Sequence, residues 1–270
     1  MSAATEGHAA PIALVTGAGR GLGAETARRL ALDGFRVALT DLAVDGPNAV
    51  AAAIRAESGQ SEDDVIVAAL DVSDREAVFA TMGEFGAHFG GLDALINNAG
   101  IISRGPAETF DPVAWQRQLD VHLGGSMHCS QAAFPLLRES SRAAIVNMAS
   151  AGSTFGLPGR LAYTTAKTGI VGLTRVLAVE WGPFGITVNS VAPGYVTAGM
   201  SQSGLDSGAL EERLLLDRIP LKRLGGASDV AYAIAFLTSE RARYVTGTML
   251  KVDGGMAVDG SVGSREEFPG

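Results

Sequence analysis

A serine, a tyrosine and a lysine in the second half of the chain could together carry out proton transfer. Tyr163 and Lys167 are four residues apart in a stretch with the apolar spacing of a helix, so both side chains are expected on one face. A phenol titrates near ~10, and an ammonium group one turn away is expected to lower that pKa, as general acid/base catalysis at neutral pH requires. Ser150 ends an apolar run thirteen residues before Tyr163 and adds a neutral hydroxyl. The three groups could hold one substrate oxygen and exchange its proton.

The Tyr-x-x-x-Lys spacing occurs by chance in many helices, so a second motif is needed to support catalysis. A glycine-rich turn near the N-terminus supplies one, in the text T-G-A-G-R-G-L-G between a predicted strand at 12–16 and a predicted helix that ends at Gly34. Gly17 would permit a tight turn, Gly21 a close approach of the backbone to a pyrophosphate, and Gly23 close packing of helix on strand. Free N–H groups at the helix N-terminus would face the phosphates. The turn therefore indicates a dinucleotide site.

The residue that ends the second predicted strand indicates which dinucleotide is bound. Asp41 lies about twenty residues past the glycine loop, where a carboxylate can accept hydrogen bonds from the adenosine ribose hydroxyls. The same carboxylate would repel the 2′-phosphate of NADP. Arg20 inside the loop acts in the opposite direction, because its guanidinium could contact that phosphate, although exposed arginines are often only solvated. We therefore expect NAD as the cofactor rather than NADP.

Composition and charge exclude several classes of partner. The chain has 270 residues, of which 47% are hydrophobic and 19% charged, as suits one compact domain. Its net charge of −8 argues against nucleic acid and anionic membranes as partners. Cys129 is the only cysteine, so neither an intramolecular disulfide nor a cysteine-based zinc site can form, and no metal site is predicted. With neither a signal-peptide pattern nor an apolar run long enough to cross a bilayer, a cytoplasmic protein is expected.

Predicted strands and helices alternate along the chain. Strands are expected at 12–16, 36–40, 65–70, 92–96, 143–149, 186–191 and 247–252, and helices after the glycine loop and at 47–58, 74–89, 111–138, 160–181 and 228–239. This alternation predicts an α/β fold, a single doubly wound Rossmann domain over residues 1–270 with a mostly parallel sheet of about seven strands. Residues 1–10 and 259–270 are expected to be loose tails. Residues 201–226 lose the β pattern and are expected to form a substrate lid.

On these motifs the chain resembles the short-chain dehydrogenase/reductase family of the classical type, over residues 12–258. The text at 16–23 is similar to the family's cofactor loop, T-G-x-x-x-G-x-G, and N-N-A-G at 97–100 to the motif that supports its central strand. The other matches are Asp71 near the adenine, the catalytic set Ser150, Tyr163 and Lys167, Pro193 and Gly194 beside the nicotinamide, and V-D-G-G at 252–255 in the closing strand.

The resemblance implies a mechanism and an assembly. Tyr163 would remove the alcohol proton while the hydride passes to the nicotinamide, and Ser150 would position the substrate oxygen. Lys167 would lower the pKa of Tyr163 and bind the nicotinamide ribose. The family also implies a homo-oligomer, usually a homotetramer, built on the helices at 111–138 and 160–181 and on the C-terminal strand. The small residues of the second helix, Ala162, Ala166, Gly169 and Gly172, would permit close approach of a partner helix.

Two positions depart from the family's pattern. His122 stands where the family usually has an asparagine that helps to hold a proton-relay water beside the lysine. A histidine could hold that water, shuttle protons itself, or only fill space. Ala198 replaces the usual threonine that contacts the carboxamide or the phosphates, and Thr197 is the candidate to take over part of that contact.

The resemblance and the motifs together give the predicted site. The predicted cofactor-binding residues are Gly17, Arg20, Gly21, Leu22, Gly23, Asp41, Leu42, Asp71, Val72, Asn98, Ala99, Gly100, Tyr163, Lys167, Pro193, Gly194, Val196 and Thr197. The predicted substrate pocket is bordered by Ser103, Arg104, Ala151, Thr154, Phe155, Tyr195 and Met200, and by the segment at 201–216. Arg104 and Arg160 could meet an acidic substrate, but exposed arginines are usually solvated, so no substrate is predicted from them.

Three function classes follow. The leading one is an NAD-dependent oxidoreductase that acts on a secondary alcohol or its carbonyl, such as a sugar, a polyol, a steroid-like ring or a hydroxyacyl group. The second is an NADPH-dependent 3-oxoacyl carrier-protein reductase, against which Asp41 speaks. The third is a non-catalytic dinucleotide-binding sensor, against which Ser150, Tyr163 and Lys167 speak and which the histidine at 122 keeps open.

Overall fold

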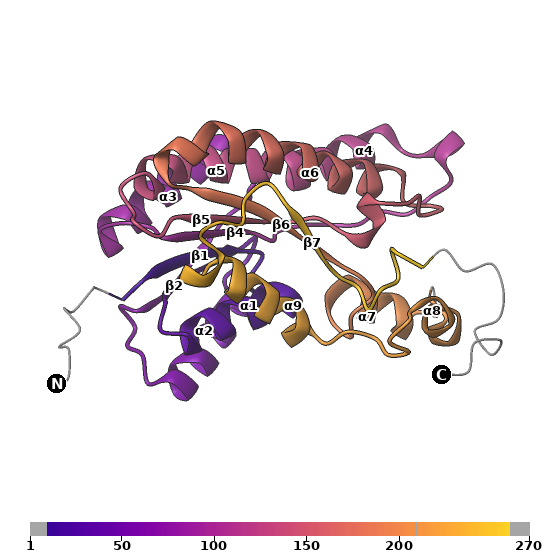
Figure 1. Cartoon of the computed structure of the whole chain (residues 1–270), viewed down its shortest axis with the longest axis horizontal. Coiled ribbons are helices and arrows are strands. Elements are labelled where there is room, and N and C mark those ends of the chain that lie inside the picture. The colour runs from indigo at the N-terminus through magenta and orange to yellow at the C-terminus, as the bar shows by residue number, and fades with distance from the viewer. Residues whose placement is uncertain (1–9, 209, 260–270) are drawn as a thin grey trace.

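The computed structural model describes residues 10–208 and 210–259, in which a single seven-stranded parallel sheet is covered by helices on both faces (Figure 1). Apart from one residue at each end, the predicted tails at 1–10 and 259–270 lie outside these residues. The strand order is β3-β2-β1-β4-β5-β6-β7. The strands are β1 (Ile12–Thr16), β2 (Arg36–Asp41), β3 (Val65–Ala69), β4 (Ala94–Asn97), β5 (Ala144–Met148), β6 (Thr187–Pro193) and β7 (Met249–Val252). The prediction of a doubly wound Rossmann domain is confirmed.

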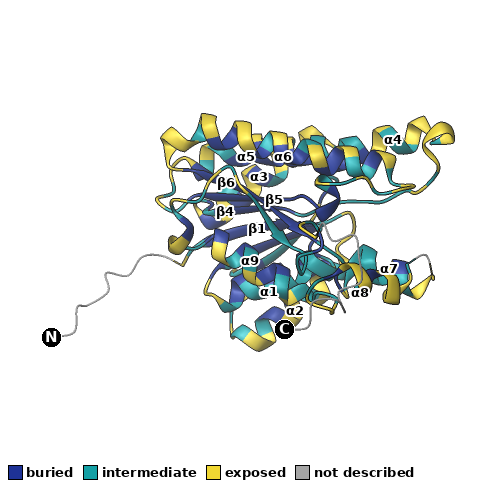
Figure 2. Ribbon diagram, turned by 45° about the vertical axis from the view of Figure 1, so that its right-hand side comes forward, coloured by how far each residue is buried: buried dark blue, intermediate teal, exposed yellow. Residues whose placement is uncertain are grey.

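The central strands are apolar because both of their faces are covered, as is usual in parallel sheets. All residues of β1, β4, β5 and β6 are buried, and yellow exposed positions lie on the outer faces of the helices (Figure 2). Helices α1 (Gly21–Leu32), α2 (Asp45–Ser58) and α9 (Ala227–Leu237) cover one face. Helices α3 (Arg75–Phe89), α5 (Gly125–Leu137) and α6 (Leu161–Trp181) cover the other.

The position of β1 fixes where a ligand can enter. This strand pairs with β2 on one side and with β4 on the other, with Val15 opposite Leu39 and Ile96. The chain therefore builds outward from β1 to β3, then crosses back to start the second half at β4. In such sheets the crevice at the carboxyl ends of the strands, at this switch point, is the usual ligand site.

The helix predicted at 111–138 is confirmed, but it contains a π turn that the sequence did not indicate. Helix α4 (Pro112–Leu119) is followed by a π-helical turn, η2 (Asp120–Gly124), and then by α5. Gly125, which follows the turn, packs closely on Val72: a Cβ there would lie 2.6 Å from a methyl carbon of that side chain. A π turn inserts one residue into a helix and often marks a functional position. Here it carries His122.

The predicted lid segment also has more regular structure than its polar sequence indicates. It contains two short helices, α7 (Gly199–Asp206) and α8 (Glu212–Arg218), which lie together beyond the end of the sheet (Figure 1). Single 3₁₀ turns η1 (Ala107–Thr109), η3 (Ala151–Ser153), η4 (Gly182–Phe184) and η5 (Glu240–Ala242) complete the described elements. None of the helices in the described part of the chain has the length and apolar character to span a bilayer.

Candidate active site

One cavity joins the two predicted sites. It has a volume of about 530 Å³ and runs along the carboxyl edge of the sheet, from the turn after β1 to the start of α6. Gly17, Gly21 and Asp41 line one end, which we call the cofactor end, and Ser150 and Tyr163 lie deeper in the same space. The motifs that the sequence places far apart are therefore neighbours around a single volume.

The backbone of the glycine loop has the conformation that a phosphate cradle needs. Gly17 and Gly21 have φ values of +64° and +59°, in the left-handed region that favours glycine. A Cβ at Gly23 would lie 2.1 Å from the carbonyl oxygen of Gly17, so helix α1 can approach the loop only because residue 23 has no side chain. The packing role predicted for Gly23 is therefore confirmed, although this residue does not itself line the cavity.

The turn after β4 holds this loop in place. The side-chain amide of Asn98 donates to the carbonyl oxygens of Thr16 and Gly17, each at 2.9 Å. In return, the hydroxyl oxygen of Thr16 accepts the backbone N–H groups of Asn98 and Ala99, each at 3.0 Å. Four hydrogen bonds across about eighty residues of sequence thus make the cofactor end a rigid cradle, and its shape fits a pyrophosphate on the N-terminus of α1.

Asp41 is fixed at the edge of the cradle. One carboxylate oxygen accepts the backbone N–H of Gly19 at 3.0 Å, and the other accepts that of Leu42 at 2.8 Å. Gly19 is also needed for this approach, because a Cβ there would lie 2.8 Å from the carboxylate. The negative charge therefore has a defined place beside the ribose position. Arg20 lines the same end of the cavity and is exposed.

Asp71 has an unexpected partner. Arg117 of α4 donates to the Asp71 carboxylate at 2.8 Å and to the hydroxyl oxygen of Ser73 at 2.5 Å, and Ser73 itself donates to Asp71 at 2.6 Å. These hydrogen bonds outweigh burial and keep the pKa of Asp71 below its usual range. Arg117 lines the cavity and was not predicted, because its partner is 46 residues away and no local pattern links the two.

The predicted catalytic side chains come from β5 and α6. Ser150 follows β5 and is only 9% exposed; Tyr163 and Lys167 project from the first two turns of α6. A hydrogen bond from Ser150 favours the phenolate form of Tyr163. The ammonium nitrogen of Lys167 donates to the carbonyl oxygen of Met148 at 2.5 Å and lies 6.0 Å from the centre of the tyrosine ring. All three line the cavity.

The expectation that Lys167 lowers the pKa of Tyr163 is not met in this arrangement. Burial raises the pKa of the phenol above its ordinary value, and the opposing influences come from Ser150 and from the positive charge of Arg160. Lys167 is itself so buried that its pKa falls to about 7, which weakens its effect as a cation. The ammonium group is directed toward the backbone of β5 rather than toward the phenol.

His122 is held as a neutral ring. Its Nε2 donates to the carbonyl oxygen of Ile101 at 2.6 Å, a contact that requires the proton on that nitrogen. Nδ1 is buried and has no hydrogen-bond partner in the part of the chain that the structure describes. Burial, with a smaller effect from the charge of Lys167, lowers the pKa of the ring to about 3. The ring stands edge-on to Tyr163 with centroids 5.5 Å apart, and packs where Gly100 has no Cβ.

Most of the predicted binding residues line the cavity, and a few do not. Thr197 is exposed, and its hydroxyl donates to the carbonyl oxygen of Gly225 at 3.3 Å. It therefore does not replace the threonine contact that is missing at Ala198, a residue that lines the cavity. Thr154 is exposed and donates to Ala151, and neither it nor Ser103 is a lining residue. Besides Arg117 and Ala198, the lining includes Ile101, Ile102, Val121, Leu157, Gly199 and Met256, which were absent from the predicted sites. Ser201 and Ser203, from the predicted border at 201–216, and Arg160 also line the cavity.

Two other chemistries have little support in the described part of the chain. Cys129 is 1% exposed, and burial raises the pKa of its thiol to about 12, so it is a packed side chain rather than a nucleophile. Among residues 10–208 and 210–259, no three His, Cys, Asp or Glu side chains are grouped so as to hold a metal ion.

Comparison with known proteins identifies the class. A family model described as enoyl-(acyl carrier protein) reductase matches residues 17–257. The chain is 37% identical to trans-4-hydroxycyclohexanecarboxylate dehydrogenase of Sinomonas cyclohexanicum over 257 residues, which cover 94% of this chain and 96% of that protein. It is also 37% identical to 3-oxoacyl-(acyl-carrier-protein) reductase of Staphylococcus aureus over 244 residues, 90% of this chain and 97% of that one.

Solved structures give the same result. The crystal structure of levodione reductase superposes with a TM-score of 0.87 at 34% identity, covering 92% of this chain and 98% of that one. A gluconate 5-dehydrogenase from Burkholderia cenocepacia, in complex with NADP and tartrate, superposes with a TM-score of 0.86 at 32% identity, covering 92% and 96%.

Fold, cavity and relatives define an oxidoreductase that uses a nicotinamide cofactor on an alcohol or ketone. The chain belongs to the short-chain dehydrogenase/reductase family.

Proposed function

We propose that the protein transfers a hydride between a small secondary alcohol, or the corresponding ketone, and NAD. The observation that carries this proposal is the single cavity that has the glycine loop and Asp41 at one end and Ser150, Tyr163 and Lys167 farther along. The bound nicotinamide would accept the hydride from the carbinol carbon or return it to the carbonyl carbon. The protein would supply orientation, exclusion of water and proton transfer.

Tyr163 is the proposed acid and base. In the oxidative direction it would take the alcohol proton, and in the reductive direction it would return a proton to the carbonyl oxygen. Ser150, already hydrogen-bonded to the phenol, would donate to the same substrate oxygen. Lys167 would hold the nicotinamide ribose hydroxyls, within reach of the Met148 carbonyl that it contacts now. For Tyr163 to act near neutral pH, the charged lysine has to move closer to the phenol once ligands are bound.

His122 is proposed as a hydrogen-bond acceptor and not as a shuttle. A shuttle has to accept and release a proton, and a ring with a pKa of about 3 stays neutral at working pH. With Nε2 committed to Ile101, the free lone pair is on Nδ1. That nitrogen could accept from a water on the path to Lys167, which is the part that the usual asparagine would otherwise play.

Asp41 supports NAD, because its fixed carboxylate would repel a 2′-phosphate. The second candidate is an NADPH-dependent 3-oxoacyl carrier-protein reductase, and two observations favour it: Arg20 lines the cavity without a side-chain partner among the described residues, and a relative with that reductase activity in its name is 37% identical. The names of the relatives also include ring compounds, so a substrate screen should start from cyclic alcohols and ketones. Fluorescence titration with NADH and NADPH separates the two candidates.

Substitution Tyr163→Phe tests the catalytic proposal. Loss of the phenol should lower kcat by about 10²- to 10⁴-fold, the usual contribution of an acid or base. NADH binding, measured by fluorescence, should be retained. Tyr244→Phe is the matched control, because Tyr244 is fully exposed outside the cavity, and it should turn over at the rate of the unsubstituted protein. Binding of NADH without turnover of any alcohol or ketone, even by the unsubstituted protein, would instead favour the dinucleotide sensor.

Two structural parts of the prediction remain proposals. The lid at 201–226 is supported by Ser201 and Ser203, which line the cavity from α7.

A homotetramer is supported by exposed apolar residues on α6, where Val176 and Val179 are 53% and 78% exposed. The small residues expected at that interface are not all free to serve it: Ala162 and Ala166 are fully buried in the chain's own core, and Gly169 faces Leu123. Light scattering would give the oligomeric state.

A further inference from the structure

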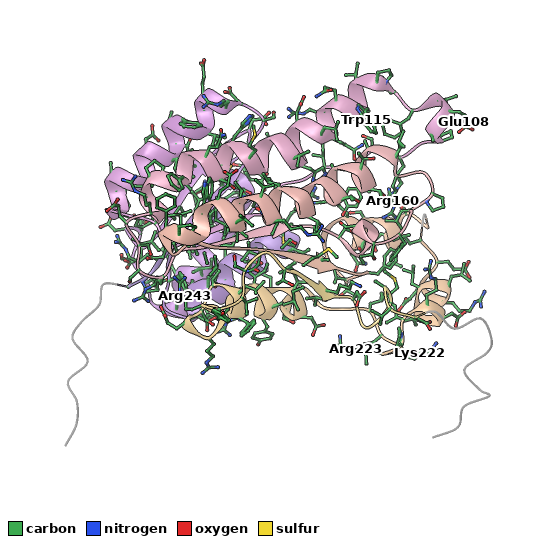
Figure 3. All side chains as sticks on the ribbon, turned by 45° about the horizontal axis from the view of Figure 1, so that its top comes forward. Glu108, Trp115, Arg160, Lys222, Arg223 and Arg243 are labelled. Carbon is green, nitrogen blue, oxygen red and sulfur yellow. The ribbon has the colours of Figure 1, made fainter. Side chains whose placement is uncertain are left out.

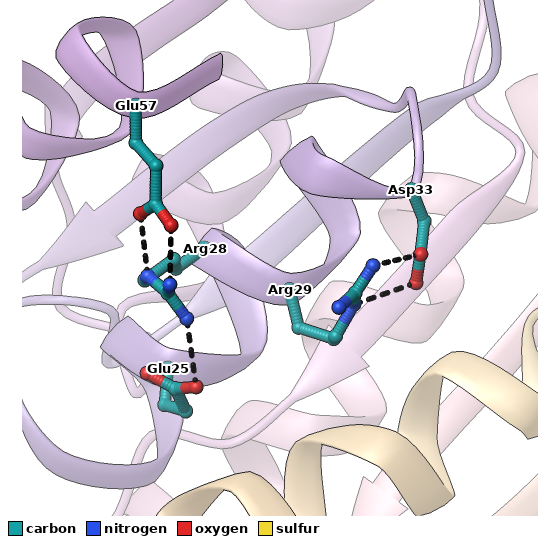
Figure 4. Close-up of polar contacts among 5 residues, drawn as sticks. All are labelled: Glu25, Arg28, Arg29, Asp33 and Glu57. Carbon is teal, nitrogen blue, oxygen red and sulfur yellow. Dashed lines mark hydrogen bonds and ion pairs between the residues drawn. The ribbon is translucent and has the colours of Figure 1, made fainter.

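The end of the cavity nearest α7, which we call the substrate end, carries two arginines without an acidic partner. Arg104 follows β4 and Arg160 precedes α6, and both line the cavity. In the described part of the chain neither takes part in an ion pair or in a side-chain hydrogen bond. Arg28 and Arg29 on α1 show the other arrangement found in this chain, in which each guanidinium meets a carboxylate (Figure 4). The two cavity arginines therefore have no counterion among residues 10–208 and 210–259.

The backbone brings these two arginines together. Residues 105 and 160 form an isolated parallel bridge, and the N–H of Gly105 donates to the carbonyl oxygen of Gly159 at 3.1 Å. Arg160 lies at the end of α6 (Figure 3), three residues before Tyr163, and is close enough for its charge to act on the phenol. Arg104 approaches α7 from the other side: a Cβ at Gly204 would lie 3.5 Å from a guanidinium nitrogen of Arg104.

The acidic residues of the cavity lie elsewhere and are already engaged. Asp41 and Asp71 are the lining carboxylates, and both are at the cofactor end. Asp41 is held by backbone N–H groups, and Asp71 by Ser73 and Arg117. The lining near the two arginines has neutral side chains, among them Phe155, Leu157, Tyr195, Met200, Ser201, Ser203 and Met256. A protein with a net charge of −8 thus presents local positive charge beside its catalytic tyrosine.

We infer that the substrate is an oxo acid or hydroxy acid whose carboxylate is bound by Arg104 and Arg160 while its carbonyl or hydroxyl oxygen lies at Ser150 and Tyr163. The inference rests on the proposed function and adds the substrate class to it. A guanidinium matches the two oxygens of a carboxylate and is less strongly hydrated than an ammonium, so it binds such a group well in a partly apolar pocket. The arginines would then fix which end of the substrate faces the nicotinamide.

Kinetics on matched acids and esters test this inference. The probes are 4-oxopentanoate and 3-oxocyclohexanecarboxylate, each compared with its uncharged methyl ester. The unsubstituted protein should reduce each acid with a kcat/KM about 10- to 100-fold above that of its ester, as expected for hydrogen bonds to a charged group. Arg104→Gln and Arg160→Gln should each lower this preference about tenfold, mainly through KM, and the double variant should abolish it.

The esters and a third arginine serve as controls. The readout is the ratio of acid to ester kcat/KM within each variant, because the charge of Arg160 also acts on Tyr163 and its loss changes the rates for both substrates. Arg241→Gln removes an exposed arginine outside the cavity that also lacks an ion pair, and it should keep the full preference for the acids. Equal use of acid and ester by the unsubstituted protein would overturn the inference. So would variants that lose acid and ester turnover in the same proportion, because that result indicates a structural role.

A binding measurement keeps the inference separate from the proposed function. In calorimetric titrations of the NADH complex, cyclohexanecarboxylate should bind more tightly than cyclohexanecarboxamide, and the double variant should lose the difference. This readout needs no turnover. If no alcohol or ketone is converted but the carboxylate is still preferred, the proposed function is wrong and the anion site stands. If ketones are reduced but carboxylate and carboxamide bind equally, the anion site is wrong and the proposed function stands.

Discussion

The cofactor end and the substrate end of the cavity differ in how their polar groups are satisfied. At the cofactor end Asp41, Asp71 and Asn98 each make at least two hydrogen bonds within the protein. At the substrate end Arg104 and Arg160 make none with side chains that the structure describes, and part of the wall comes from the short helix α7. The cofactor end would bind the same ligand in every reaction, so its polar groups can be held by hydrogen bonds within the protein. The substrate end would select the substrate, so the charges of its arginines are left for the substrate to neutralise.

The largest effect on stability is expected when a side chain is added at the cofactor end, where helix α1 packs on the glycine loop. A Cβ in Gly23→Ala would lie 2.1 Å from the Gly17 carbonyl oxygen and 2.5 Å from the Asn98 amide nitrogen, so backbone has to move. Such overpacking is expected to cost about 1–3 kcal/mol of unfolding free energy and to weaken NADH binding. Gly156→Ala at the substrate end meets nothing within 4 Å and should stay within about 0.5 kcal/mol. Urea unfolding measures both; equal losses would contradict the contrast between the two ends.

A change of one charge should alter cofactor preference without altering the fold. Asp41→Asn keeps the size of the side chain but removes the charge that opposes a 2′-phosphate, so the ratio of NADPH to NADH affinity should rise about 10- to 100-fold. Asp45→Asn, an exposed carboxylate at the start of α2, should leave the ratio unchanged. Fluorescence titrations with both cofactors measure the ratio. An unchanged ratio in Asp41→Asn would mean that the backbone contacts of Asp41 matter and its charge does not.

The smallest effect is expected at His122, which lies between the two ends of the cavity. It is a change in the free energy of unfolding that should appear only below about pH 6.5. The folded-state pKa is about 3 and the ordinary value of a histidine is 6.5, so in that interval the unfolded chain binds a proton that the folded chain does not. Stability therefore falls as the pH drops from 6.5 toward 3. His122→Asn should reduce this fall, as measured by urea midpoints at pH 6 and pH 4. Lys167 does not confuse the comparison, because with a pKa of about 7 it is charged in both states in most of that interval.

Much of the fold could be predicted because its signals are local. The apolar runs of the strands, the glycine turn before α1 and the Tyr163 to Lys167 spacing lie within single segments, and the structure agrees with each. The π turn escaped prediction because one inserted residue hardly changes a 3.6-residue pattern. The Arg117 contact to Asp71 and the direction of the Lys167 side chain also escaped, since each depends on partners that only the folded sheet brings near.

The placement of β1 inside the sheet, between β2 and β4, has a consequence for the order of folding. Strands β1, β2 and β3 can pair as soon as the first third of the chain is available, but β1 meets β4 only across about eighty residues, a closure that is slow to form. The glycine loop receives its bonds from Asn98 only after that step. A nascent or refolding chain therefore has to pair β1 with β4, which are far apart in the sequence, before a bound dinucleotide can stabilise it. Added NADH should then leave the early folding rates unchanged and act only on the last step.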